Sequence, residues 1–454
     1  MLANIPQEVL DVCQRLRAAG HQAFIVGGSI RDLLIGRPPG DFDVATSAHP
    51  EETLRVFGNR FAVPTGLAHG TVTVRVGPAG AERHVEVTTF RGEGAYLDGR
   101  HPSTVTFSAT LDEDLARRDF TMNAIACDPA TGTIVDPYGG RADIARKLVR
   151  TVGEPGLRFT EDGLRPMRAV RQAAQLGFTI EGATEAAIPA TLASFRKVSV
   201  ERIRDELRKL LLAPVPSVGI EAMRRTGLLA EVLPELLPTI GCRQNRFHKH
   251  DVYAHTLATL DAAVPDFLVR MAALLHDLGK PGTQAPRADA PGEFSFFRHE
   301  QIGSEMADAV CTRLRLATSE RETICRLVSG HMFFYTPDWT DGTVRRFVKR
   351  VGPDLVPLLF ALREADIASR GQGEDREAET RELRGRIAEV AAADAALRVR
   401  DLDIDGTDVM RILAIPPGPR VGEVLEALLE RVLDDPKLNE RETLAGLVRE
   451  MAAE

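Results

Sequence analysis

The hydrophobic and polar positions follow two different patterns along the chain. Near the N-terminus an amphipathic stretch, Gln7–Ala19, precedes an apolar run at Ala23–Val26, and apolar and polar residues alternate in Thr71–Val76 and His84–Thr88. Alternation with a period of two predicts strands, whereas apolar residues three or four apart predict helices. From residue 151 onward almost every segment has the helical spacing. The pattern therefore predicts a mixed α/β head followed by a long helical part.

Breaks rich in Pro, Gly and charged residues divide this outline further. The expected fold class is α+β, with a mixed β-sheet and helices in the head and only helices in the body. We predict four parts: a head at 1–150, a helical neck at 151–245, a third helical part at 246–370 and a helical tail at 371–454.

The composition is typical of a globular protein, with 44% hydrophobic and 27% charged residues. No stretch reaches the roughly 18 apolar residues of a membrane span, and the first residues lack the pattern of a signal peptide. The five cysteines are scattered and form no C-x-x-C pair, which disfavours a disulfide framework and a zinc-thiolate site. We therefore expect a cytoplasmic protein without membrane contact, and the oligomeric state stays open.

The net charge of −8 disfavours a protein coated with basic residues, but the charge is unevenly distributed. Residues 141–210 contain 14 Lys and Arg against 9 Asp and Glu. A local excess of this kind suits RNA or a triphosphate, and it equally suits a solvated helical face.

The first group of residues with chemical meaning lies in the head. Gly27 and Gly28 stand between the apolar run and a helix, where glycines let backbone N–H groups approach a phosphate chain. Asp41 and Asp43 follow, two residues apart in a strand and therefore on one face. Carboxylates suit Mg²⁺, which prefers oxygen ligands, and Glu86 on the alternating strand adds a third. Such a site would activate a 3′ hydroxyl and stabilise a leaving pyrophosphate.

The run GGSIRD followed by DFD resembles the head of class II nucleotidyltransferases, the family of CCA-adding enzymes and bacterial poly(A) polymerases. Further blocks match in order over most of the first 180 residues: TGLAHGTVTV, VEVTTFR, YLDGRHP, DLARRDFTMNAIA, DPYGGRADI and EDGLRPMRAVRQAAQLGF. The resemblance implies that Asp41 and Asp43 bind the catalytic Mg²⁺. It also implies that Gly28 and Arg31 contact the triphosphate, that Arg118 contacts the nucleotide, and that Asp119 faces the ribose.

The block EDGLRPMRAVR carries the prediction about base selection. Asp162 and Arg165 are three residues apart on a predicted helix and are therefore expected on one face. Asp accepts hydrogen bonds and Arg donates them, so the pair matches the Watson–Crick edge of a base. The resemblance implies that this pair selects CTP or ATP. Arg168 and Arg171 continue the face toward phosphate or base, although a basic helix that meets only solvent is the alternative.

A second group of residues lies in the third part of the chain. An adjacent His-Asp pair, His276 and Asp277, ends an apolar helix ahead of Gly-Lys, which resembles the HD phosphohydrolase superfamily. Imidazole and carboxylate ligands together favour a divalent transition metal over Mg²⁺. Two alternatives remain open for this part of the chain. The site hydrolyses phosphoesters, or the part is only a helical spacer in which the site is an inherited remnant. The expected ligands are His255, His276, Asp277, His299, His331 and Asp366.

The resemblance implies that the helical body and tail clamp the upper half of tRNA, whose shape and phosphates such a surface can bind. The expected activity is template-independent addition of C, C and A to the tRNA 3′ end from CTP and ATP. The resemblance also implies complete addition, because a shortened loop between Glu86 and Arg117 is associated with family members that add only C, and here the loop looks full length. The alternatives are a CC-adding enzyme, an A-adding enzyme or a poly(A) polymerase of the same family, and an HD-dependent phosphohydrolase whose head only binds nucleotide.

Overall fold

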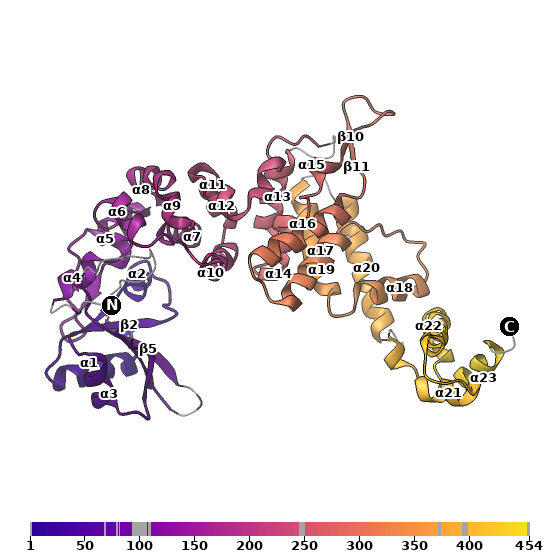
Figure 1. Ribbon diagram of the computed structural model, residues 1–454, viewed down its shortest axis with the longest axis horizontal. Coiled ribbons are helices and arrows are strands. Elements are labelled where there is room, and N and C mark those ends of the chain that lie inside the picture. Colours follow the sequence, from indigo (N-terminus) through magenta and orange to yellow (C-terminus); the bar gives the residue numbers. More distant parts are fainter. Residues whose placement is uncertain are drawn as a thin grey trace. The chain divides into compact units, whose positions relative to one another are not determined.

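The structure is a computed structural model, and it describes residues 2–67, 70–78, 80, 82–92, 107, 110–244, 250–370, 374–392 and 398–451. The chain divides into two compact units, Met1–Pro234 and Glu235–Glu454, whose elements are labelled in Figure 1. The first unit contains a large sheet with helices, and the second is almost entirely helical in its described part. This confirms the predicted fold class.

A mixed sheet with the strand order β3-β4-β5-β2-β1-β6-β7 forms the centre of the head. Strand β2 pairs antiparallel with β1 and parallel with β5, which sets Asp43 beside Val26 on one side and Glu86 on the other. Directly paired residues of neighbouring strands share a face, so Asp43 and Glu86 emerge together. The strands are β1 (Ala23–Val26), β2 (Phe42–Thr46), β3 (Ala62–Gly66), β4 (Thr71–Val76), β5 (Arg83–Thr89), β6 (Ala126–Cys127) and β7 (Ile134–Val135).

The alternating pattern explains the burial within this sheet. Val72 and Val74 of β4 and Val85 and Val87 of β5 are all buried, as the period of two predicts. Helices α1 and α3 pack against the strands through their apolar faces. The helices of the head are α1 (Gln7–Ala18), α2 (Gly28–Leu34), α3 (Pro50–Phe57), α4 (Leu111–Ala116) and α5 (Gly140–Arg146).

The rest of the first unit is built around α7 (Arg165–Leu176), which packs against α10 and α11. Met167, Val170 and Ala173 lie on its buried face, and its arginines lie on the face toward the head. The other elements are β8 (Leu148–Val149), β9 (Thr179–Ile180), α6 (Pro155–Glu161), α8 (Gly182–Ala187), α9 (Leu192–Phe195), α10 (Val200–Leu211), α11 (Pro216–Thr226) and α12 (Leu228–Val232).

The second unit is centred on α14 (Phe267–Leu275), whose residues are apolar nearly all round and mostly buried. It packs against α13, α17 and α19 and ends directly before His276. The surrounding elements are α13 (Val252–Ala262), α15 (Lys280–Thr283), β10 (Gln284–Pro286), β11 (Phe294–Phe296), α16 (His299–Arg313), α17 (Thr318–Gly330), α18 (Asp341–Val351), α19 (Val356–Arg370) and α20 (Glu374–Ala392).

The C-terminal helices have a hydrophobic core of their own, which includes Leu428, Val432, Leu444 and Val448. They are α21 (Gly406–Leu413), α22 (Pro419–Asp434) and α23 (Arg441–Met451). The 3₁₀ helices of the chain are η1 (Leu2–Asn4), η3 (Thr121–Asn123), η4 (Pro189–Thr191), η5 (Pro234–Thr239), η6 (Val399–Asp401) and η7 (Pro436–Leu438). Throughout the described residues, no helix is both long and apolar enough to cross a bilayer.

Candidate functional site

Three carboxylates form the acidic part of the head site. Asp43 on β2 is half-buried and stands beside Glu86 of β5, and Asp41 is exposed directly before β2. Burial raises the pKa of Asp43 to about 6, with Glu86 and Asp41 adding to the rise and Arg118 opposing it. The strand register therefore brings Asp43 and Glu86 together, and Asp41 lies near enough to Asp43 to affect its pKa.

The turn between β1 and α2 requires glycine. Gly27 has a φ of 78°, and a Cβ at this position would lie 2.8 Å from Nη1 of Arg118 and 3.7 Å from Oδ2 of Asp43. Only glycine combines this backbone conformation with so close an approach. Gly28 then begins α2, and Arg31 reaches from the first turn to Oδ1 of Asn123 at 2.8 Å.

A buried carboxylate fixes the arginine pair that follows α4. Asp114 accepts hydrogen bonds from Nη2 of Arg117 at 2.6 Å and from Nη2 of Arg118 at 3.1 Å. Burial would raise the pKa of Asp114, but the two guanidinium groups outweigh burial and lower it. Arg118 is thereby held between the Gly27 turn and the acidic cluster.

Asp119 is buried at the centre of a hydrogen-bond network. Its Oδ1 accepts from the Phe120 N–H at 2.8 Å and from Nδ2 of Asn123 at 3.0 Å, and its Oδ2 lies 2.7 Å from Nη2 of Arg168. Burial works against ionisation, yet Arg168 and the hydrogen bond from Asn123 hold the pKa of Asp119 well below its usual value. Asn123 also donates to Oε1 of Gln172, so the network joins α7 to the head.

The structure corrects one expectation about base selection. Asp162 and Arg165 do not share a helix, because α6 ends at Glu161 and α7 begins at Arg165. Asp162 is extended, and its Oδ1 accepts a hydrogen bond from the Leu164 N–H at 3.0 Å. A Cβ on Gly163 would lie 2.2 Å from the carbonyl oxygen of Ser194, so the chain bends tightly against a neighbouring backbone here. A turn rather than a helix face brings the two side chains to the same cavity.

Both members of this pair have partners. Nη2 of Arg202 lies 3.0 Å from Oδ2 of Asp162. Arg165 is buried, and it donates from Nη1 to Oε2 of Glu161 at 2.7 Å and from Nη2 to the Arg117 carbonyl oxygen at 2.9 Å. These bonds fix the orientation of both side chains.

The two further arginines of α7 are also held in place. Arg168 pairs with Asp119, which together with Glu206 raises its pKa. Arg171 pairs with the buried Glu206 of α10 and donates from Nη1 to Oε1 of Gln175 at 2.6 Å. Neither arginine is the purely solvated cation that the alternative interpretation expected.

These elements enclose one cavity of about 500 Å³ in the first unit. Of the ten residues predicted for catalysis and nucleotide binding, all except Asp41 line it. Arg91, Asn123 and Gln172 also line the cavity and were not predicted, although the quoted blocks contain all three. The block YLDGRHP, and much of the loop whose length favours complete addition, lies outside the described residues. The predicted residues in the lining are Gly28, Arg31, Asp43, Arg118, Asp119, Asp162, Arg165, Arg168 and Arg171.

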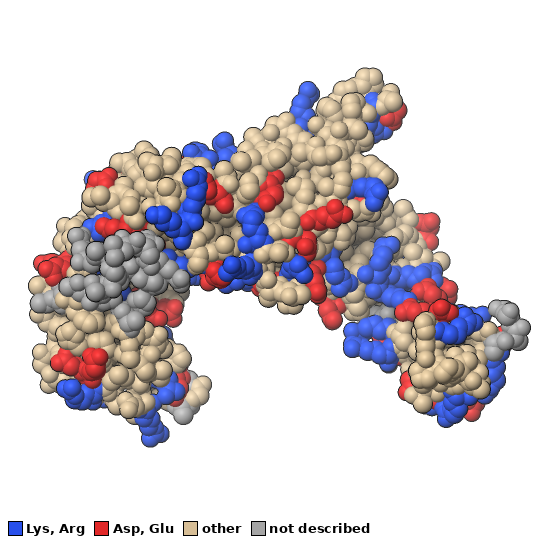
Figure 2. All heavy atoms as spheres, in the orientation of Figure 1, with Lys and Arg blue, Asp and Glu red and all other residues tan. Residues whose placement is uncertain are grey.

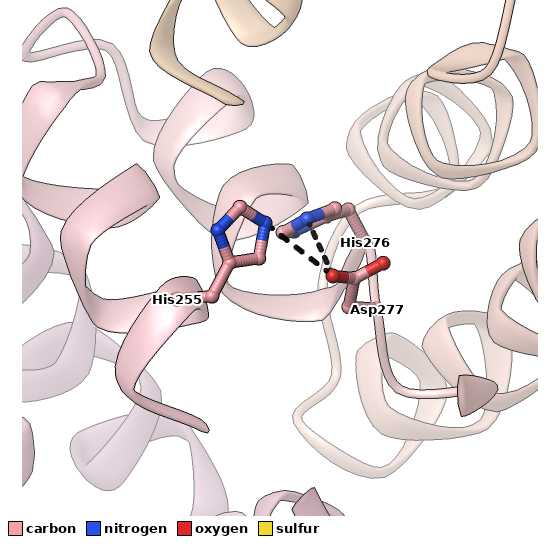
Figure 3. A group of neighbouring side chains, drawn as sticks. All are labelled: His255, His276 and Asp277. Atoms are coloured by element: carbon pink, nitrogen blue, oxygen red, sulfur yellow. Dashed lines mark ion pairs between the residues drawn. The ribbon is translucent and has the colours of Figure 1, made fainter. Parts of the chain in front are cut away.

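The second unit gathers the predicted HD residues from different helices. Their positions are the interior of α13 and α19, the residues after α14 and α17, and the first residue of α16. Figure 3 shows His255 and His276 directed toward Asp277. Two overlapping groups have all their ligand atoms within 4.8 Å of one another. They are His255, His276 and Asp277, and Asp277, His299 and His331.

The histidines are oriented as metal ligands. Nδ1 of His276, His299 and His331 lies 2.7–2.8 Å from a main-chain carbonyl oxygen of the preceding turn. A carbonyl only accepts, so Nδ1 carries the proton and the lone pair of Nε2 points inward. Nε2 of His299 and Oδ1 of Asp277 are buried without a hydrogen bond to any described residue. This donor set fits a divalent transition metal.

Electrostatics at this centre favours the ligating forms of three histidines and of Asp277, whereas at His276 burial is outweighed by the neighbouring Asp277, which raises the pKa. Burial lowers the pKa of His255 and His299 and lowers that of His331 to about 3, so these rings are neutral. Burial opposes ionisation of Asp277, but His276 and Lys280 hold its pKa well below the usual value.

Two cations beside the HD residues were not predicted. Nζ of the buried Lys280 lies 2.7 Å from Oδ2 of Asp277. Arg370 donates to both oxygens of Asp366, at 3.0 and 2.6 Å, while Oδ1 of Asp366 lies 3.2 Å from Nε2 of His255. Asp366 is therefore at the edge of the centre, shared with an arginine. The Gly-Lys that follows His-Asp was the available signal for Lys280.

Comparison with known protein families gives three matches along the chain. Residues 23–150 match the Poly A polymerase head domain, residues 177–239 match a probable RNA- and SrmB-binding site of polymerase A, and residues 252–390 match the HD domain. The first match covers the sheet and its acidic cluster, and the third covers all six HD residues.

Several curated relatives are similar over nearly the whole chain. A CCA-adding enzyme of Streptococcus gordonii is 33% identical over 98% of this chain and 97% of its own length. An A-adding tRNA nucleotidyltransferase of Deinococcus radiodurans is 35% identical over 90% of this chain and 91% of its own. A CCA-adding enzyme of Anoxybacillus flavithermus is 48% identical, but the aligned part spans about half of each protein, 51% of this chain and 56% of the relative.

Solved structures of CCA-adding enzymes are similar to the whole chain as well. The CCA-adding enzyme of Bacillus stearothermophilus in complex with CTP is 31% identical, with a TM-score of 0.72 over 98% of this chain and 97% of that one. The Thermotoga maritima CCA-adding enzyme complexed with tRNA has a TM-score of 0.58 over 99% of this chain and 97% of that one. It is 18% identical, so this likeness concerns the fold alone.

Proposed function

Because the chain belongs to the family of CCA-adding tRNA nucleotidyltransferases, we propose that it adds C, C and A to the 3′ end of tRNA, using CTP and ATP and releasing pyrophosphate. The observation that carries this proposal is that nine of the ten predicted residues line one and the same cavity in the head. Seven arginines and four acidic residues line that cavity, and this excess of positive charge suits a triphosphate.

Asp41, Asp43 and Glu86 would hold Mg²⁺ at this site. The fit rests on the acidic cluster itself, where burial and two neighbouring carboxylates raise the pKa of Asp43 despite Arg118. Clustered oxygen donors with too little compensating positive charge favour a hard divalent cation. When bound, the metal supplies charge stabilisation for the reacting phosphate and its leaving group.

The chain's own residues bind and orient the reactants. The tRNA 3′ hydroxyl attacks the α-phosphorus, and pyrophosphate leaves on the opposite side. Arg118 and Arg31 lie beside the Gly27 turn, where they bind the negative charge of the triphosphate. Their ion pairs and hydrogen bonds with the protein fix them before substrate arrives, so they stabilise developing charge without reorganising.

We assign the choice of base to Asp162 and Arg165. The carboxylate accepts and the guanidinium donates, which matches the edges of cytosine and adenine. In the free protein Asp162 is bound by Arg202 and Arg165 by Glu161, so an incoming base exchanges with these partners or is read beside them. Arg168 and Arg171, held by Asp119 and Glu206, also line the cavity, and we assign them to nucleotide binding.

The test of this function is an extension assay on tRNA that lacks its 3′ CCA. The purified protein is incubated with Mg²⁺ and with CTP, ATP or both, and product length is read on a sequencing gel. The proposal predicts growth by two residues with CTP alone, growth by three with both nucleotides, and then arrest. Asp43→Asn is the matched inactive control. No growth in any mixture would contradict the proposal.

A second candidate is an A-adding enzyme, which the likeness to the Deinococcus radiodurans relative over most of both chains favours. The same gel separates the two. An A-adding enzyme would leave tRNA without CCA unchanged by CTP and would extend tRNA ending in CC by one residue with ATP. Arrest after CC with both nucleotides would indicate a CC-adding enzyme, and a ladder of A residues would indicate a poly(A) polymerase.

We further propose that the HD centre binds a divalent transition metal through His255, His276, Asp277, His299 and His331, with Asp366 at its edge. All six side chains are 1–6% exposed, which favours a metal that stabilises the helical bundle over one that meets a phosphoester. Metal analysis of the purified protein tests this. We expect metal in the wild type and its loss in His276→Gln, and a wild-type protein that takes up no such metal would contradict it.

A further inference from the structure

A second cavity lies in the C-terminal unit, and none of the residues assigned a role above lines it. It has a volume of about 530 Å³ and is enclosed by the end of α17, the segment 331–340 and helices α18 and α19. Sites for small organic ligands span roughly 300–1,000 Å³, so this cavity is large enough for one nucleotide. Gly330 and Met332 line it, whereas His331 between them points the other way, into the HD centre.

Aromatic rings form much of the wall. The rings of Trp339 and Phe347 have centroids 5.7 Å apart, and those of Phe333 and Phe347 are 5.2 Å apart. These contacts hold the inner rings in fixed positions. Phe334 also lines the cavity but is 67% exposed, which is unusual for so large an apolar side chain beside a hollow. Aromatic faces at the mouth of a cavity suit a flat partner, and every nucleobase has such a face.

Positive charge borders the aromatic wall. Arg326 and Arg350 line the cavity, and its described lining contains no acidic residue. Nη2 of Arg326 is bound to the Val351 carbonyl oxygen. Arg350 is exposed, its guanidinium lies 5.7 Å from the Phe347 ring centroid, and it forms no ion pair with any described residue. Figure 2 shows blue Lys and Arg side chains over the α18 region.

Two neighbouring cations of α18, unlike Arg350, form ion pairs with acidic residues of α22. Nη1 of Arg346 lies 2.7 Å from Oδ1 of Asp434, and Nζ of Lys349 lies 2.8 Å from Oε2 of Glu426. Both are therefore engaged with α22. Arg345, the fourth cation of α18, is buried and donates from Nη1 to the Leu433 carbonyl oxygen, so Arg350 is the α18 cation that remains available to an anion at the mouth of the cavity.

We propose that this cavity binds one unpaired nucleotide of the RNA substrate, with its base against Phe334 and Trp339 and its phosphate at Arg350. Charge complementarity selects this occupant, because an aromatic wall with two arginines and no acidic residue in its described lining matches a base that carries a phosphate. Glu430, which lines the adjoining hollow with Arg350, is paired with Lys349. Proteins bind unpaired RNA nucleotides in this way, by stacking and by contacts with arginine. The inference rests on the proposed function only in taking tRNA as the RNA.

The chain contains a single tryptophan, and it stands in this wall, so its fluorescence reports occupancy directly. The experiment titrates the full-length protein with tRNA that lacks CCA, without nucleotides, and follows Trp339 emission. We expect saturable quenching by stacking. Phe334→Ser and Arg350→Gln should weaken the quenching and raise KM for tRNA about tenfold, a magnitude within the range for loss of one stacked base. kcat and KM for CTP should stay unchanged, and Phe334→Tyr should restore the wild-type values.

Two substitutions on the β10–β11 ribbon are matched controls. Phe297 is 82% exposed and Arg287 is partly exposed and remote in sequence from the cavity, so Phe297→Ser and Arg287→Gln change the same residue types elsewhere in the unit. Absence of quenching in the wild type would overturn the proposal, as would equal KM values in the two cavity variants and the two controls. If no nucleotide is added but RNA still quenches Trp339 in the wild type and less so in Phe334→Ser, the proposed function fails and the nucleotide site stands.

Discussion

The ionised carboxylate of Asp43 should destabilise the folded protein when no metal is bound, because it is partly buried beside two other carboxylates. Burial beside Glu86 and Asp41 raises its pKa from 3.8 to about 6. A shift of this size corresponds to about 3 kcal/mol against the ionised form in the folded state. A carboxyl with a raised pKa contributes its full stability below pH 3.8 and loses it as the pH rises through 6. At pH 7.5 the folded head therefore carries the whole cost of an ionised Asp43.

Asp43→Asn keeps the shape of the side chain and removes this charge. In a metal-free buffer at pH 7.5 the variant should be more stable than the wild type by up to about 3 kcal/mol, which is roughly 2–4 °C in Tm for each kcal/mol in a unit of this size. The advantage should shrink as the pH falls from 6 toward 4, because the wild-type carboxyl then binds a proton. Mg²⁺ should stabilise the wild type and leave the variant unaffected.

Thermal unfolding followed by circular dichroism measures these effects. It is recorded with and without Mg²⁺, at pH 7.5 and at pH 4. Asp11→Asn on the exposed face of α1 is the control for loss of a carboxylate without burial. The variant should add no nucleotide to tRNA, so stability and activity should move in opposite directions. An equal or lower Tm for Asp43→Asn at pH 7.5 would refute the reasoning, and so would substantial residual activity.

Three further predictions concern the turn, the buried network and the second unit. Gly27→Ala places a Cβ 2.8 Å from a nitrogen of Arg118 on a backbone with positive φ, so it should lower kcat/KM for CTP at least tenfold, and unchanged kinetics would contradict the role of the turn. Asp119→Asn leaves the Arg168 guanidinium beside an amide, so it should destabilise the protein by about 2–4 kcal/mol. In a double-mutant cycle with Arg168→Gln, most of this free energy should appear as coupling energy between the two residues. Additive effects of the two substitutions would exclude a stabilising pair. Removal of transition metal by a chelator should lower the Tm of the unit that contains His331 while tRNA extension with added Mg²⁺ persists, and an unchanged Tm would show that the HD centre carries no stabilising metal.

The sequence was sufficient for the fold class, and most of the predicted residues lie together in the head cavity and at the HD centre. The structure confirms the strands β4 and β5, which alternation predicted, and the helices after residue 151, which the helical spacing predicted. Such patterns are reliable because each one follows from which face of the element is buried. Asp43 of the D-x-D pair located the acidic cluster, but the shared strand face was wrong for Asp41, which lies directly before β2, is exposed and does not line the cavity. Whether these residues perform the chemistry assigned to them stays a prediction.

The helix expected across Asp162 and Arg165 was wrong for a reason that local pattern does not contain. Gly163 lies against the backbone of Ser194, about thirty residues away in the sequence, and this contact imposes a turn where periodicity favours a helix. Lys280 and Gln172 were missed in a similar way, since their partners Asp277 and Asn123 give them meaning only once the helices have packed.

The central claim is that one set of side chains in the head cavity selects the base that is joined to tRNA. The measurement that tests it most directly is the ratio of kcat/KM for CTP and ATP on one tRNA preparation, in the wild type and in Asp162→Ala and Arg165→Ala. We predict that the ratio falls at least tenfold in both variants while KM for tRNA stays within about twofold of wild type, since one base-pairing contact contributes about 1–3 kcal/mol of discrimination. An unchanged ratio in either variant would contradict the claim.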